Sequence, residues 1–174
     1  AMIASLAVIP VSMSEQAATP SIENHEHITL RELARIVPTG FGAILLVGLA
    51  HGGMLGMAVI YATREGLSIG RTGVLVAVIQ LGGMALTWPI SSASDDLDRR
   101  IIGLLITLGA IVMSVVMLYQ PAESIWTIVL LFVIGGLSFP LYAIASAYTN
   151  DWVSPEQMGA AASQLVTLYG FGAM

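Results

Sequence analysis

The sequence contains no cysteine and no lysine, and only 10% of its 174 residues are charged. Without cysteine the chain forms no disulfide, no zinc–thiolate site and no cysteine nucleophile. Six arginines without a basic cluster give nucleic acid no surface to bind. A soluble domain carries about 25% charged residues, and a chain that is 56% hydrophobic could not cover its own surface with polar groups. Soluble, collagen-like and disordered chains are therefore excluded.

The few charges are separated by long uncharged runs, which is typical of membrane-spanning helices. Four internal runs lack Asp, Glu, Lys and Arg, and each is at least as long as the roughly 20 residues that cross the hydrocarbon core. The sequence therefore predicts an all-α, polytopic membrane protein that is surrounded by membrane lipid. The expected spans are 39–63, 72–91, 101–119, 125–150 and 157–174, and the last is nearly complete.

Both ends of the sequence lie within apolar segments. Residues 1–14 resemble the end of a truncated span, and residues 15–38 form a polar linker before the transmembrane bundle of residues 39–174. Within the linker, Thr29 and Glu32 have the spacing of a capping box, which predicts a short amphipathic helix at the membrane surface.

Two further local patterns concern the last helix and the orientation of the chain. Ser154, Pro155 and Gln157 predict a helix that begins with a serine N-cap. Four of the six arginines fall on the side of the linker and of the 94–100 turn, which favours a cytoplasmic location for that side.

The first span carries small residues and one ionisable side chain on neighbouring faces. Gly48, Gly52 and Gly56 repeat every four residues, a spacing that lets another helix approach closely. His51 is the one ionisable residue in any predicted span apart from the tyrosines. Two roles for it are open: a neutral histidine bonded to a neighbouring helix, or a ligand in a central cavity.

Mildly polar stripes also follow the second, fourth and last predicted spans. Lipid disfavours such stripes, so they face either another helix or a water-filled cavity. The third span has a broad apolar remainder and is predicted to be a peripheral support helix. The candidates for the lining of a substrate cavity are His51, Gln80, Tyr142, Ser146 and Gln164.

No group of residues indicates an enzyme, and we expect neither a cofactor nor a bound metal. The acidic residues at 95, 96 and 98 lack the glycine and distal glutamate of a calcium loop. His25 and His27 lie in an acidic linker and form at most a weak metal site.

The segment Trp88–Arg100 resembles the loop signature of the major facilitator superfamily, and more narrowly that of a bacterial permease branch within it. The residues that match this branch are Ser94, Asp95, Asp98, Arg99 and Arg100. Ser91, Asp96 and Asp98 depart from the general signature of the superfamily. Residues 139–151, 155–156 and 169–172 are also similar to the tenth and eleventh spans of that branch.

The resemblance implies that this chain is the second half of a twelve-span fold, truncated at both ends. The expected function is secondary active transport of a small molecule by alternating access, in a multi-pass protein of the bacterial inner membrane. The missing six-span N-terminal half would be its partner. The five residues that match the signature form a candidate gating loop. Its arginines can pair with carboxylates or with the negative end of a helix, in contacts that exist in one state and break in the other.

Two other matters stay open at this point. A non-transporting membrane scaffold or assembly subunit would use the same stripes only for packing.

No Asp or Glu lies inside a predicted span, so proton coupling, where it occurs, uses His51 or lies in the missing half; we favour the missing half.

Overall fold

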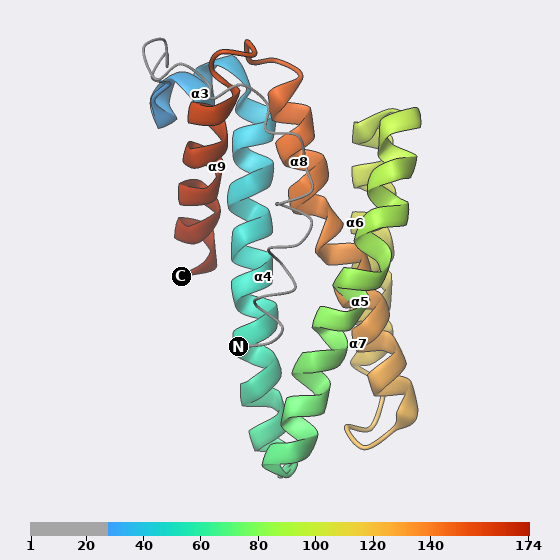
Figure 1. The fold of residues 1–174 in the computed structure, drawn as a ribbon. Helices are drawn as coiled ribbons and strands as arrows, with labels where there is room; N and C mark the ends of the chain where they lie inside the picture. The colour runs from blue at the N-terminus through green and yellow to red at the C-terminus, as the bar shows by residue number, and fades with distance from the viewer. Residues whose placement is uncertain (1–27) are drawn as a thin grey trace, which may run out of the picture.

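A computed structural model describes residues 28–174, which fold into helices joined by short turns, with no strand in that part of the chain (Figure 1). In chain order the helices are α3 (Leu30–Ile36), α4 (Pro38–Arg64), α5 (Ile69–Asp96), α6 (Arg99–Met117), α7 (Ile125–Ser138), α8 (Pro140–Asn150) and α9 (Met158–Ala173). Residues 1–14, the start of the linker, His25 and His27 lie outside the described residues.

Four segments of the described chain are long and apolar enough to cross a membrane. They are α4, α5, α6 and the segment Ile125–Asn150, which combines α7 and α8. Helix α5 runs to Asp96, so part of the 94–100 turn is helical. Helix α9 has 16 residues.

The start of α9 differs from the sequence prediction. Ser154 is not its N-cap: the Ser154 carbonyl accepts a hydrogen bond from the N–H of Gln157 at 3.0 Å, which closes a tight four-residue turn. The first α-helical bond then runs from the N–H of Ala161 to the carbonyl of Gln157, and the helix begins at Met158.

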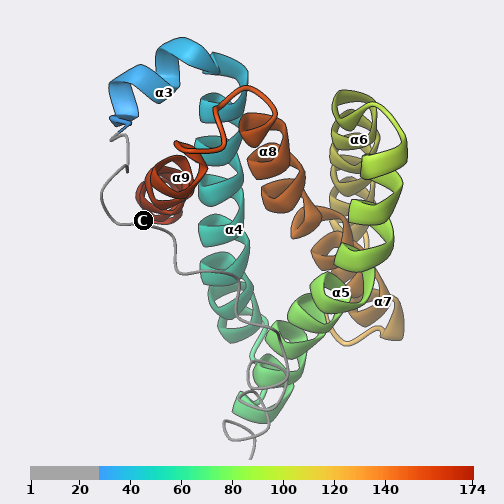
Figure 2. The ribbon, with the colours of Figure 1, turned by 45° about the horizontal axis from the view of Figure 1, so that its top comes forward.

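The short helix α3 lies across one end of the bundle, crosswise to α4 (Figures 1 and 2). Its first turn forms the expected capping box: the Thr29 N–H donates to Glu32 Oε2 at 2.8 Å, and the Glu32 N–H donates to Thr29 Oγ1 at 3.3 Å. Leu33 is fully buried in a core that includes Ile44 and Leu165. Apolar contacts and a satisfied N-terminus thus hold α3 against α4 and α9.

Helices α4 and α9 form one of two closely packed helix pairs. A Cβ added at Gly48 would overlap the carbonyl oxygen of Tyr169, and one added at Gly52 would overlap that of Ala173. Gly172 is in equally close contact with the backbone of α4. The predicted packing role of Gly48 and Gly52 corresponds to this contact, in which absent side chains let two backbones approach.

Gly56 makes no such contact among the described residues, and its packing role stays a prediction. A Cβ at Gly56 would meet no atom within 4 Å among the described residues. Gly52, one turn before it, faces Ala173 of α9.

The second closely packed pair consists of α5 and α7. A Cβ at Gly82 would overlap the carbonyl of Phe132, and one at Gly135 would overlap the carbonyl of Ile79. The two pairs lie on opposite sides of the bundle, with α8 between them (Figure 1). Helix α6 is peripheral among the described helices, since only 6% of its most apolar 18-residue stretch is buried.

The fourth span is interrupted rather than continuous. Phe139 separates α7 from α8, and Pro140 has no N–H with which to continue the helical hydrogen bonds. The Tyr142 N–H bonds to the carbonyl of Phe139 at 3.3 Å instead of to that of Ser138. The Ser138 carbonyl is therefore available to another donor.

Candidate functional site

Arg99 joins three elements at the end of the bundle that carries α3. Its side chain forms an ion pair with Asp95 of α5 at 3.3 Å and a second with Asp151, directly after α8, at 3.2 Å. Arg99 is only 25% exposed, while the two carboxylates are 66% and 52% exposed. The guanidinium provides donors in two directions, so it can hold both carboxylates at once.

Arg100 makes a separate contact with α8. Its Nη2 donates a hydrogen bond to the hydroxyl of Tyr148 at 2.5 Å, and its guanidinium carbon lies 5.1 Å from the centre of the same ring. The two neighbouring arginines thus attach the start of α6 to the end of α8 through different chemistry.

The remaining residues of the candidate gating loop shape its backbone. Ser94 is buried and its hydroxyl donates to the carbonyl of Ser91 at 2.9 Å within α5. Asp98 is the N-cap of α6 and accepts a hydrogen bond from the N–H of Arg100 at 2.8 Å. These contacts fix the positions from which Arg99 and Arg100 extend.

Sequence reasoning missed Asp151 and Tyr148 as partners of the loop. A single acid at the end of a span resembles any interfacial charge, and a tyrosine there resembles an interfacial anchor. Only the approach of α8 to the start of α6 shows that both face the arginines.

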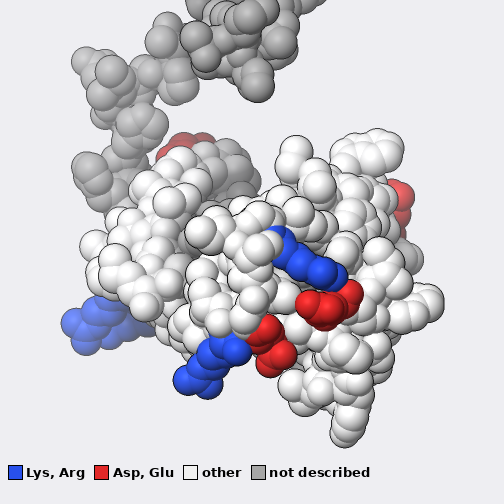
Figure 3. All heavy atoms as spheres, turned by 90° about the horizontal axis from the view of Figure 1, so that it is seen from below, with Lys and Arg blue, Asp and Glu red and all other residues white. Residues whose placement is uncertain are grey.

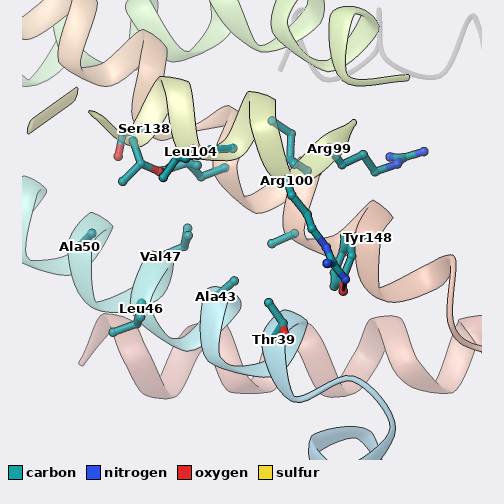
Figure 4. A pocket seen from close by; sticks show the side chains of 15 residues that line it. Thr39, Ala43, Leu46, Val47, Ala50, Arg99, Arg100, Leu104, Ser138 and Tyr148 are labelled. Carbon is teal, nitrogen blue, oxygen red and sulfur yellow. Dashed lines mark hydrogen bonds between the residues drawn. The ribbon is translucent and has the colours of Figure 1, made fainter. Parts of the chain in front are cut away.

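A cavity of about 580 Å³ lies below these contacts, between α4, α6 and α8 (Figure 4). Its walls are mostly apolar and include Ala43, Val47 and Leu104. Ser138 is a polar residue of the lining. In Figure 4 Arg100 extends toward Tyr148, whereas Arg99 points away from the hollow. None of the five predicted substrate-cavity residues lines this cavity.

His51, the first of those candidates, is buried, with only 2% of its surface exposed. Its Nε2 lies 3.0 Å from the carbonyl of Ser138, and its Nδ1 lies 3.0 Å from the hydroxyl of Tyr169. A carbonyl can only accept, so Nε2 carries the proton and donates. In the neutral ring, Nδ1 then accepts a hydrogen bond from the Tyr169 hydroxyl.

The other four candidates lie in different surroundings. Tyr142 is half-buried, and its ring meets that of Tyr169 edge to face at 5.1 Å, so the structure brings Tyr142 into the His51 cluster. Ser146 and Gln164 are half-buried on α8 and α9. Gln80 is exposed on α5, on a different face from the buried Ile79 and Gly82 that pack against α7.

The opposite end of the bundle carries few charges. Figure 3 shows a mostly uncharged surface on which acidic and basic side chains lie next to one another. There the Arg71 Nη2 donates to the carbonyl of Glu123 at 2.7 Å, which joins the start of α5 to the turn before α7. No group of three or more potential metal ligands occurs among residues 28–174.

These features define a polytopic helical membrane protein with a network of charged residues at one end. The family model of the Major Facilitator Superfamily matches residues 1–174, so the chain belongs to that superfamily. Its membership agrees with the resemblance carried by the Trp88–Arg100 segment.

Curated relatives carry the same family assignment. The chain is 25% identical over 154 residues to "Uncharacterized MFS-type transporter YcaD" of Escherichia coli O9:H4 (strain HS). It is equally similar to the proteins of that name from E. coli strains SMS-3-5 / SECEC and K12 / DH10B. The match covers 87% of this chain and only 39% of each relative. No solved structure matches the chain.

Proposed function

We propose that this chain is the second half of a secondary transporter that moves a small molecule by alternating access. The proposal places it in the bacterial inner membrane, with a six-span half of the same protein as its partner. Family membership and the transporters named among its relatives support this function. The side with α3 and the 94–100 turn would be cytoplasmic.

The observation that carries the proposal is the double ion pair of Arg99. It connects the end of α5, the start of α6 and the end of α8 through side chains that water reaches. Exposed ion pairs contribute about 0.2–1 kcal/mol each. Such contacts are weak enough to form in one state and break in the other, as a gate between two states requires.

Accessibility of a cysteine tests this proposal without knowledge of the substrate. In the full-length protein, Gln80→Cys would report from which side of the membrane water reaches the bundle. The measured quantity is the rate at which this cysteine reacts with a membrane-impermeant methanethiosulfonate added outside. If the Arg99 contacts hold the cytoplasmic end closed, Asp95→Asn should lower that rate about 2-fold, the effect of losing about 0.4 kcal/mol. Asp96→Asn removes a neighbouring carboxylate outside the Arg99 ion pairs and serves as the control.

Equal membrane abundance of the variants, measured by immunoblot, shows that insertion is intact. An unchanged labelling rate in Asp95→Asn would refute the gating role. If the cysteine reacts in no variant, whether the reagent is added on one side of the membrane or on the other, the result would instead favour a non-transporting membrane subunit.

A further inference from the structure

His51 occupies the junction between the two glycine-packed helix pairs. It belongs to α4 and binds Tyr169 of α9, so it is part of the α4–α9 pair. Its other nitrogen binds the carbonyl of Ser138, the last residue of α7. A single buried imidazole thus connects one pair to the end of a helix of the other.

Phe139 completes this connection. Its ring stacks on His51, with centroids 4.7 Å apart and planes inclined by 27°. On its other side the Phe139 ring fills the space that a side chain at Gly83 would occupy. Phe139 therefore lies between α4 of the first pair and α5 of the second.

The connection falls at the break in the fourth span. Because Pro140 interrupts the helical hydrogen bonds, the direction of α8 relative to α7 is not fixed by a continuous helix. The interfaces of the two pairs, by contrast, are backbone against backbone and leave little freedom. The break is thus the place where the two pairs can shift, and His51 holds the carbonyl that the break leaves available.

We propose that His51 is a positioning residue, a latch that binds the end of α7 directly and reaches α8 through the Tyr169 ring, which packs on Tyr142 of α8. The latch thereby fixes α8 relative to α7 and holds the two helix pairs in one arrangement. Its part in a transport cycle rests on the function proposed above. The latch has two bonds that separate variants can remove: Nε2–H to Ser138, and the Tyr169 hydroxyl to Nδ1.

Spin labels at Ile125 of α7 and Ala147 of α8 would measure the angle at the break. This chain has no cysteine to replace, and neither position takes part in the latch. The full-length protein in lipid nanodiscs, studied by double electron–electron resonance, should give one narrow distance distribution. His51→Asn, whose amide is too short to reach Ser138, should at least double the width of that distribution.

The second bond and the control use conservative variants. Tyr169→Phe removes one hydroxyl without opening a cavity, and it should also broaden the distribution. His51→Gln, whose amide can still donate toward Ser138, should restore more of the wild-type width than His51→Asn. Tyr119→Phe, an exposed phenol outside the latch, should leave the distribution unchanged.

Unchanged distributions in both His51→Asn and Tyr169→Phe would overturn the latch. If His51→Asn does not fold, Tyr169→Phe alone decides. The distance measurement needs no transport, so broadening combined with an unaltered labelling rate in Asp95→Asn would refute the gate and keep the latch. The reverse combination would refute the latch and keep the gate.

Discussion

Arg99 at the start of α6 and Asp151 after the end of α8 form an ion pair of 3.2 Å between the third and fourth spans. The same guanidinium holds Asp95 at the end of α5. The turn between the second and third spans is thereby attached to the loop before α9. A change in the direction of α8 would move Asp151 relative to Arg99 and so break or remake their ion pair. The ion pair at the end of the bundle thus depends on the helix break at Pro140.

The two glycine-packed interfaces should tolerate no added side chain. Gly48→Ala or Gly82→Ala would force a methyl group onto a carbonyl oxygen of the facing helix. Such overpacking costs about 1–3 kcal/mol, so each variant of the full-length protein should melt at a lower temperature in a thermal-shift assay.

Gly56→Ala is the matched control for these variants, because its added methyl meets open space among the described residues. Alanine favours a helix over glycine by about 1 kcal/mol, so its melting temperature should stay equal or rise. A melting temperature of Gly48→Ala equal to that of Gly56→Ala would contradict close packing of α4 on α9.

The capping box of α3 should make this helix sensitive to acid. The hydrogen bond from the Thr29 backbone N–H, followed by that from its hydroxyl, lowers the pKa of Glu32 from the ordinary value of 4.5. A lowered pKa in the folded state means that the stabilisation is present above about pH 4.5 and is lost as the pH falls through the lowered value.

A spin label at Ile36, which is 47% exposed at the end of α3, would detect this loss as increased mobility below pH 4.5. Glu32→Gln keeps a residue suited to the capping box and removes the charge, so its mobility should not change over the same pH range. Equal pH profiles of the two proteins would show that Glu32 does not cause the change.

From uncharged runs the sequence predicted the four segments that are long and apolar enough to cross a membrane, and it predicted the capping box from two residues. It also indicated Gly48 and Gly52, because a repeat of four places both on one face. The α5–α7 contact escaped prediction, since the polar stripe that includes Gln80 lies on a different face from Gly82. Proline is tolerated in membrane helices, so Pro140 alone did not indicate a break.

The polar stripes give a prediction about the exposed face of α5. If this face borders a water-filled path in the transporter proposed above, Gln80→Cys should react with a charged thiol reagent. Val112→Cys on the peripheral helix α6, 55% exposed and expected to face lipid, should react at least ten times more slowly. Equal reaction rates at the two positions would contradict a path along α5.

The most direct test of the gate exchanges the charges of Arg99 and Asp151 in the full-length protein that carries Gln80→Cys. Either Arg99→Asp or Asp151→Arg alone should lower the rate of external methanethiosulfonate labelling by about 2- to 5-fold, the range for exposed ion pairs. The double variant restores an opposite-charge pair and should recover most of that loss. A double variant as slow as the product of the two single effects would contradict a gate formed by this ion pair.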